Sequence, residues 1–149
     1  MNSTYSLSHG TIGMVISMPH NGVQIPESIA KNMIPNSLKV ADTDWYMDKL
    51  YDFAKTMGIY TLSPKYNRYV IDLNRSPKGD VLYVGKNNTE LCPTTAFDLS
   101  PLYIDNKNPT SAEIAHRIEH YWRPYHQALQ STLSKLKEEH GKVVLLDAH

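Results

Sequence analysis

The chain has 149 residues, of which 41% are hydrophobic and 20% charged, and its 15 lysines and arginines balance 15 aspartates and glutamates. A neutral chain without a basic stripe does not suit nucleic acid or a membrane surface as main partner, so we expect a small molecule. Cys92 is the one cysteine, which excludes a disulfide within the chain, and neither signal-peptide features nor an apolar run of membrane-spanning length is present. These features predict a cytoplasmic location.

The first half of the chain predicts a strand followed by a helix. Residues 12–18 form an apolar run that ends at Pro19-His20-Asn21-Gly22, which indicates a buried strand and a tight turn. A helix is expected from Asp42 or Thr43 to Met57, with Gly58 as its stop. Its buried face would consist of apolar residues that recur every three or four positions, namely Tyr46, Leu50, Phe53, Ala54 and Met57.

The second half predicts further strands and one long helix. Residues 59–62 and 68–73 have strand-like composition. Thr110-Ser111-Ala112-Glu113 matches a capping box and should open the longest helix, which Gly141 ends and Pro124 kinks. A last apolar strand then rises through Val143 and Val144.

This order of elements predicts an α/β fold in which a mixed sheet lies between helices. No repeat, low-complexity tract or linker divides the chain, so residues 1–149 are expected to form a single domain. The sequence stops directly after a strand, where an ordinary domain continues with a loop and a covering helix. We therefore expect this domain to be incomplete at its C-terminus.

Two histidines and two aspartates are candidate metal ligands. His20 and His149 each follow an apolar strand, at the end where open α/β sheets place their ligands, and Asp42 and Asp44 stand at a predicted helix start. Two histidines and one aspartate could hold a catalytic zinc ion, whose open fourth position takes a water with a pKa of about 7. The alternative is that the histidines make ordinary loop hydrogen bonds and the aspartates favour the helix start through its dipole.

A second polar cluster suits a substrate with a free carboxylate. The guanidinium groups of Arg68 and Arg75 can form bidentate pairs with a carboxylate, and the amide of Asn74 can add a hydrogen bond. The alternative is a structural ion pair between these arginines and Asp72 or Asp80.

A further motif has a structural explanation. His116-Arg117-Ile118-Glu119-His120 fits the H-x-x-E-H pattern of one class of zinc protease. At about 100° per residue, however, His116 lies opposite the apolar stripe that contains Ile114 and Ile118. We therefore expect His116 and His120 to face solvent.

Taken together, these clusters resemble the N-formylglutamate amidohydrolases, deformylases of one route of histidine breakdown. The likeness spans nearly the whole chain, and its specificity comes from many clusters in one order. These are residues 19–22 with 25–26, 42–45 with 48–51, 68–75, 82–83, 91–93, 101–103, 122–126 and 147–149.

The resemblance implies a fold and a set of metal ligands. The family looks like a branch of the zinc-carboxypeptidase-like hydrolases (phosphorylase/hydrolase-like), which are three-layer sandwiches with a mixed sheet between helices. Carried over by position, the likeness implies zinc, or another divalent metal, bound by His20, Asp44 and His149, with Asp42 as the rival to Asp44. Asn21 stands where the family pattern has a serine.

The resemblance also implies a reaction, the hydrolysis of the formamide bond of N-formyl-L-glutamate to L-glutamate and formate. Asn74 and Arg75, assisted by Arg68, would bind the substrate carboxylates. Family members continue past the last strand, and the wider group takes its catalytic glutamate from there, so the general base is expected beyond residue 149. The alternative is a truncated or inactive protein of the same fold that binds acyl amino acids, and the surface left by the missing part is expected to favour self-association.

Overall fold

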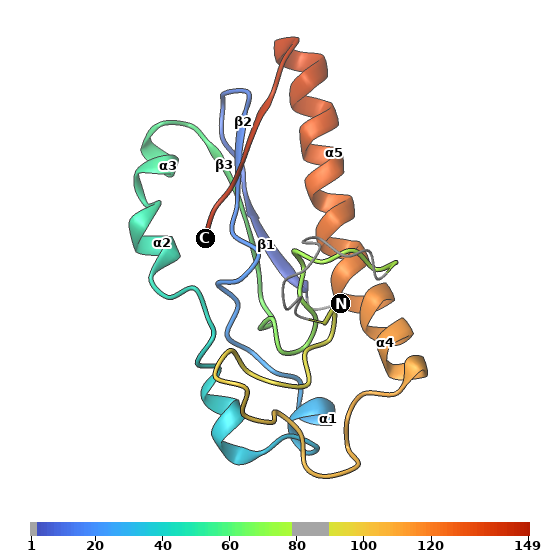
Figure 1. Cartoon of the computed structure of the whole chain (residues 1–149). Helices are drawn as coiled ribbons and strands as arrows, with labels where there is room; N and C mark the ends of the chain where they lie inside the picture. The colour runs from blue at the N-terminus through green and yellow to red at the C-terminus, as the bar shows by residue number, and fades with distance from the viewer. Residues whose placement is uncertain (1–2, 79–89) are drawn as a thin grey trace, which may run out of the picture.

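A four-stranded mixed sheet forms the centre of the molecule (Figure 1). The computed structural model describes residues 3–78 and 90–149, so Leu82 and Tyr83, which carry part of the resemblance, lie outside the described residues. The order across the sheet is β1-β3-β2-β4, where β1 is antiparallel to β3 and β2 is parallel to both β3 and β4. The predicted mixed sheet is therefore confirmed, and its strands are β1 (Tyr5–Ser8), β2 (Met14–Ser17), β3 (Tyr60–Pro64) and β4 (Val144–Asp147).

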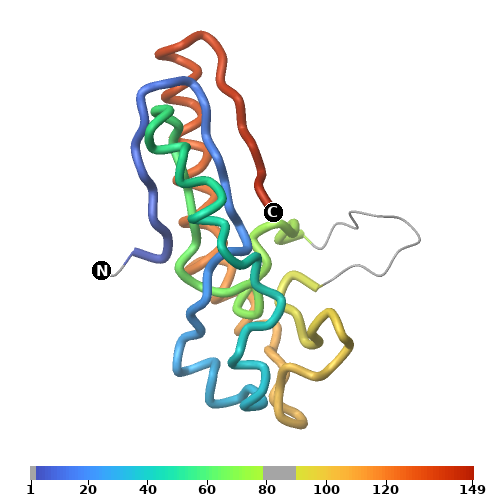
Figure 2. The backbone as a smooth tube through the Cα atoms, turned by 90° about the vertical axis from the view of Figure 1, so that its left-hand side faces the viewer, coloured from blue at the N-terminus to red at the C-terminus, as the bar shows by residue number. Residues whose placement is uncertain are grey.

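Helices lie on both faces of this sheet. Helix α5 (Arg123–His140) follows one face, and the short helices α2 (Met47–Leu50) and α3 (Phe53–Thr56) lie on the other, the side that Figure 2 presents to the viewer. Side chains of β2 alternate between the two faces. Val15 packs in a core with Leu136 of α5, whereas Ile16 packs in a core with Ala54 of α3.

The longest helical stretch begins where the sequence predicts. The Thr110 hydroxyl accepts from the Glu113 N–H while the Glu113 carboxylate accepts from the Thr110 N–H, which makes a capping box at the start of α4 (Ser111–Arg117). The chain continues through a π-helical turn, η2 (Ile118–Trp122), into α5, which ends at Gly141 with a φ of 75°. Neither this stretch nor any other described helix has the length and apolar character of a membrane span.

The helix predicted for residues 42–57 is wrong in its extent and in its buried face. Helices α2 and α3 are separate, and Tyr46 has a left-handed φ of 63°, which a continuous right-handed helix excludes. Most of the predicted buried face is exposed, for example Tyr46 at 70% and Leu50 at 63%, whereas Met47 and Ala54 are buried. Gly58 does end the segment, with a φ of 70°.

Residues 68–73 are buried but do not form the predicted strand. They are turns, in which the Val70 N–H donates to the Asn67 carbonyl oxygen and the Asp72 N–H donates to that of Leu91. Val70 is fully buried and Ile71 is 3% exposed. A short apolar run indicates only that its residues are buried. It is therefore compatible with a turn inside the core as well as with a strand.

β1 and β4 are the edge strands of the sheet. β1 is not among the predicted strands, although its sequence Tyr5-Ser6-Leu7-Ser8 alternates apolar and polar residues and its burial alternates with them, as in a half-buried strand. β4 is a predicted strand, yet all four of its residues are exposed, and among the described residues only β2 pairs with it.

Candidate metal centre

Three predicted ligands meet at one end of the sheet. Because β2 and β4 are parallel neighbours, the residues that follow them, His20 and His149, emerge side by side. The Ala148 N–H donates to the Ser17 carbonyl oxygen at 2.8 Å and holds this end of the chain against β2. Asp44 joins from the turn before α2, because its backbone N–H donates to the His20 carbonyl oxygen at 3.0 Å.

The ligand atoms of these three side chains converge. Nδ1 of His20 lies 3.1 Å from Nδ1 of His149, which lies 3.2 Å from Oδ2 of Asp44. The third separation, between Nδ1 of His20 and Oδ2 of Asp44, is 3.7 Å. Among the histidines, cysteines and carboxylates of the described residues, this is the group of three that could hold a metal ion.

The spacing and chemistry of this group fit a small divalent cation. Imidazole nitrogen and carboxylate oxygen bind zinc at about 2.0–2.2 Å, so two ligands of a tetrahedral site lie roughly 3.3 Å apart. The separations of 3.1, 3.2 and 3.7 Å are close to that value. Three protein ligands of this kind leave one coordination position open, as catalytic zinc sites require.

Asp72 fixes the orientation of His20. Its Oδ1 lies 2.6 Å from Nε2 of His20, and the residue is 1% exposed. Burial by itself raises the pKa of Asp72, but the hydrogen bond and the charge of His20 outweigh burial and lower it. When His20 is neutral, the ionised carboxylate accepts a hydrogen bond from its Nε2–H, and the Nδ1 lone pair faces Asp44 and His149. Metal-binding histidines commonly have a carboxylate in this place.

His149 has a carboxylate beside its outer nitrogen as well. Its Nε2 lies 3.3 Å from Oδ2 of Asp147, which can accept the Nε2–H, and 3.3 Å from Nδ2 of Asn74, which is itself a donor and so packs beside a protonated Nε2 without accepting from it. These contacts are longer than the one behind His20, and the His149 side chain is 40% exposed. The second histidine is therefore held less tightly than the first.

Arg68 reaches the cluster through Asp44. Its Nη2 donates to Oδ1 of Asp44 at 3.4 Å, and its guanidinium lies 5.0 Å from the ring centre of Phe97. The ion pair considered from the sequence therefore forms with Asp44 rather than Asp72, while Asp80 lies outside the described residues. Arg68 thus binds the carboxylate oxygen of Asp44 that does not face the histidines.

Asn74 and Arg75 lie beside the same cluster. The Asn74 N–H donates to Oδ1 of Asp72 at 2.9 Å, so one carboxylate oxygen binds both His20 and this turn. The Arg75 Nη1 donates to the Asn74 carbonyl oxygen at 3.0 Å. The predicted carboxylate-binding pair and the predicted metal ligands are therefore adjacent.

Asp42 lies outside this cluster. Its Oδ2 accepts from the Phe97 N–H at 2.9 Å, and its own N–H donates to the Tyr69 hydroxyl at 3.3 Å. Of the two aspartates that the sequence offers, Asp44 is the one at ligand distance from the histidines.

The helix histidines face solvent, as predicted. His116 and His120 are exposed and stack with ring centres 3.8 Å apart, and Nδ1 of His120 bonds to the His116 carbonyl oxygen. The glutamate of the motif, Glu119, forms an ion pair with Arg123. In the part of the chain that the structure describes, no third ligand joins the two histidines.

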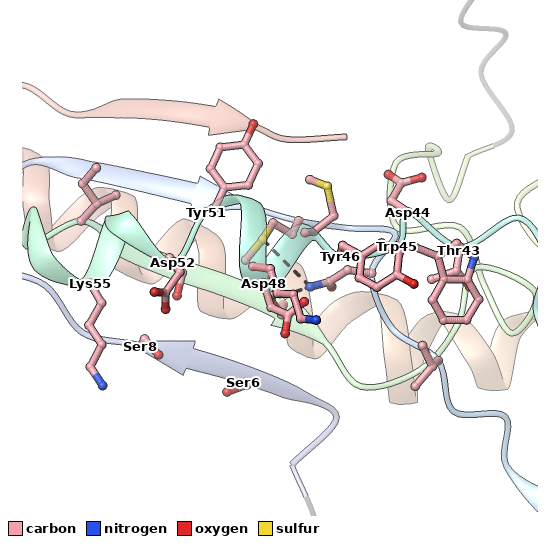
Figure 3. A pocket seen from close by; sticks show the side chains of 18 of the residues that line it. Ser6, Ser8, Thr43, Asp44, Trp45, Tyr46, Asp48, Tyr51, Asp52 and Lys55 are labelled. Carbon is pink, nitrogen blue, oxygen red and sulfur yellow. Dashed lines mark hydrogen bonds between the residues drawn. The ribbon is translucent and has the colours of Figure 1, made fainter.

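A groove of about 650 Å³ extends from the cluster along the opposite face of the sheet from α5. Figure 3 shows it between Ser6 and Ser8 of β1 and the α2–α3 segment, with Asp44 near one end and Lys55 at the other. Asp44 is the one proposed ligand that lines it, and Arg75 does not. The groove therefore begins at the cluster but lies apart from the carboxylate-binding pair.

The partner role of Asp72 is a feature that the sequence analysis misses. The residue stands inside an apolar run, and a carboxylate buried in such surroundings requires a hydrogen-bonded partner. That requirement was a usable signal, but the sequence does not identify the partner, because His20 is 52 positions away.

The Asp72→Asn variant should bind zinc about 10–100-fold more weakly than the unchanged chain, because the amide cannot stabilise the same tautomer and charge of His20. Competition with a chromogenic chelator measures the affinity. Asp147→Asn serves as the matched variant and should have a smaller effect, since its contact with His149 is longer. Equal affinities for Asp72→Asn and the unchanged chain would show that Asp72 does not support the site.

Similar proteins share both the sequence and the fold. Residues 12–149 match the N-formylglutamate amidohydrolase family. The chain is 36% identical over 149 residues to the N-formylglutamate deformylase of Pseudomonas putida and 37% identical to that of Pseudomonas aeruginosa. It covers 55% and 56% of those proteins, and thus spans about half the length of the curated relatives it matches.

Solved structures agree with these matches. The crystal structure of N-formylglutamate amidohydrolase from Ralstonia eutropha JMP134 superposes with a TM-score of 0.78 and 26% identity, over 98% of this chain and 56% of that one. A gene product of Agrobacterium tumefaciens shares the fold, with a TM-score of 0.76 at 14% identity over 99% of this chain and 56% of its own. The sequence match and the shared fold together show that the chain belongs to the N-formylglutamate amidohydrolase family.

Proposed function

We propose that this chain forms the metal-binding part of a zinc-dependent amidohydrolase that hydrolyses N-formyl-L-glutamate to L-glutamate and formate, as a step in histidine degradation. The observation that carries the proposal is the convergence of His20, Asp44 and His149 at ligand spacing. The names of the Pseudomonas relatives support the substrate. The helices on both faces of the sheet, with ligands after adjacent parallel strands, support a zinc-carboxypeptidase-like three-layer fold.

One set of residues would bind the metal, and a neighbouring set would bind the substrate. His20 and His149 would hold zinc through Nδ1 and Asp44 through Oδ2, and bound zinc would supply a Lewis acid for the formyl oxygen and lower the pKa of water. Arg75 and Asn74 would bind the glutamate carboxylates, assisted by Arg68. Fixing the carboxylates orients the formyl group, which lowers the barrier through positioning.

Hydrolysis also requires a group that moves a proton. The water oxygen loses a proton and bonds to the formyl carbon, the carbon–nitrogen bond breaks, and the leaving nitrogen gains a proton. Of the residues that the structure describes, three carboxylates lie beside the cluster and each already has a partner: Asp44 has Arg68, Asp72 has His20, and Asp147 has His149. This engagement favours a second candidate function, in which the chain binds acyl amino acids without hydrolysing them.

Formate release separates the two functions. The zinc-loaded chain is incubated with N-formyl-L-glutamate, formate is measured with formate dehydrogenase, and ligand affinity is measured by calorimetry. Formate production that disappears in His20→Ala supports the amidohydrolase. Binding without formate, retained after chelation of zinc and lost in Arg75→Ala, supports the binding protein.

We also propose that the open edge of β4 mediates self-association with a second copy of the chain. Val144, Leu145 and Leu146 are 56%, 43% and 37% exposed, and an exposed apolar edge strand favours pairing with another strand. Antiparallel pairing of two β4 strands would place Leu145 opposite Leu146 and keep the two Asp147 carboxylates apart.

The Val144→Lys variant should therefore remain monomeric at protein concentrations where the unchanged chain elutes earlier in size-exclusion chromatography. A lysine on the edge opposes pairing through charge repulsion between copies. Leu38→Lys, which changes an exposed leucine far from the sheet edge, should leave the elution unchanged. A monomeric unchanged chain at all concentrations would rule out this interface.

A further inference from the structure

Two aromatic side chains on the long helix bind the turn that carries Asn74. The indole Nε1–H of Trp122 donates to the Arg75 carbonyl oxygen at 2.9 Å, and Nε2 of His126 lies 2.9 Å from the Leu73 carbonyl oxygen. A carbonyl accepts only, so His126 carries its proton on Nε2. The helix thus binds the carbonyl groups of the residues before and after Asn74.

The two rings also support each other. Trp122 and His126 are one helical turn apart and stack with ring centres 3.8 Å apart and an interplanar angle of 26°. Burial lowers the pKa of His126, which keeps the ring neutral and its single N–H committed to the Leu73 carbonyl. The stacked rings of Trp122 and His126 therefore present two N–H donors to the turn in a fixed relative position.

A helical irregularity overlaps this pair, because the π-helical turn ends at Trp122 and Pro124 lies between the two rings in sequence. Pro124 has no N–H to offer the His120 carbonyl, and its ring crowds that carbonyl, so an ordinary α-helical turn is disfavoured. The Arg123 N–H donates instead to the Ile118 carbonyl oxygen, five residues back, which is the hydrogen bond of a π-helix. Tyr125 anchors the next turn, since its hydroxyl lies 2.8 Å from Oγ of Ser17 at the end of β2.

The contacts continue from the turn to both histidines of the metal centre. The Asn74 N–H donates to Oδ1 of Asp72, and that oxygen binds His20. The Asn74 side-chain amide lies 3.3 Å from Nε2 of His149. Asn74 is therefore the residue through which the helix reaches both sides of the cluster.

We propose that Trp122 and His126 are positioning residues, which hold the Leu73–Arg75 turn so that Asp72 orients His20, Asn74 packs beside His149, and Arg75 faces the substrate carboxylate. The inference rests on the proposed function for its consequence in metal binding.

The test removes one donor at a time and keeps the rings. Trp122→Phe keeps a ring stacked on His126 but loses the N–H that donates to the Arg75 carbonyl. His126→Phe keeps a ring stacked on Trp122 but loses the N–H that donates to the Leu73 carbonyl. His126→Gln is the conservative variant, because its side-chain amide can donate to the same carbonyl. Gln127→Ala, an exposed position on the same helix, is the matched control.

Two measurements are made on each variant. Zinc affinity by chelator competition should fall about 3–10-fold in Trp122→Phe and His126→Phe, the range expected for one lost hydrogen bond, and recover in His126→Gln. Amide hydrogen exchange in the metal-free chain should accelerate at Asn74 by a similar factor in the same two variants and stay unchanged in Gln127→Ala. A purely structural role would accelerate exchange across the helix and sheet together.

The two measurements distinguish this inference from the proposed function. If the unchanged chain binds no zinc but the variants accelerate exchange at Asn74, the proposed function fails and the positioning role stands. If the unchanged chain binds zinc and both phenylalanine variants match it in affinity and in Asn74 exchange, the positioning role is overturned. Acceleration spread over the whole chain would overturn it as well.

Discussion

Replacement of His20 by alanine should weaken zinc binding so far that the dialysed protein retains no stoichiometric zinc. His20 is 5% exposed, contributes one of three ligand atoms, and is the histidine whose orientation a buried carboxylate fixes at 2.6 Å. The unchanged chain should retain about one equivalent of zinc after dialysis, and loss of one ligand from such a site should weaken binding on the order of 100-fold or more. Elemental analysis of the dialysed protein measures the stoichiometry, and chelator competition measures the affinity.

The chain offers matched controls for both ligand types. His116→Ala removes an exposed histidine from the helix motif and should leave zinc binding unchanged, whereas Asp44→Asn should weaken it and Asp42→Asn should not. The two aspartates are two positions apart, but only Asp44 lies 3.2 Å from Nδ1 of His149. Metal loss in His116→Ala with retention in His20→Ala would assign the site to the helix and contradict the proposed centre.

The meeting of the two candidate histidine ligands was predictable, because strand ends are local features of the sequence. An apolar run that stops at a histidine marks the carboxyl end of a buried strand, and the two runs before His20 and His149 did form parallel neighbours. Their pairing brings the histidines together without further information. The choice between Asp42 and Asp44 stayed open, because it depends on which backbone N–H bonds to the His20 carbonyl.

The turn that carries Asp44 is also the place where the helix predicted for residues 42–57 was wrong. The Asp44 N–H donates to a carbonyl 24 positions earlier in the chain, and Tyr46, two residues later, has a left-handed φ of 63° that interrupts a right-handed helix. Periodicity describes only local preference, and a long-range contact at the site overrides it. The same limit hid the roles of Asp72, Trp122 and His126, whose partners lie 47 to 53 positions away.

Replacement of Arg75 by alanine should weaken binding of N-formyl-L-glutamate about 10–100-fold, the loss expected for a charge-assisted hydrogen bond. Arg75 donates from its guanidinium to the carbonyl oxygen of Asn74, whose side chain contacts His149, so the guanidinium lies beside the candidate metal centre. Arg75→Lys should recover little of the affinity, because an ammonium cannot form a bidentate pair with a carboxylate. Titration calorimetry with the zinc-loaded chain measures both variants.

A substrate analogue that lacks one carboxylate tests whether the affinity lost in Arg75→Ala comes from a contact with that carboxylate. N-formyl-γ-aminobutyrate lacks the α-carboxylate of N-formyl-L-glutamate, so if Arg75 binds that group, Arg75→Ala should bind the truncated ligand as well as the unchanged chain does. Arg123→Ala, which removes an exposed arginine paired with Glu119, should bind both ligands normally. An equal loss for both ligands would place Arg75 on the other carboxylate or in the support of the turn, and affinities unchanged by Arg75→Ala would remove it from the substrate site.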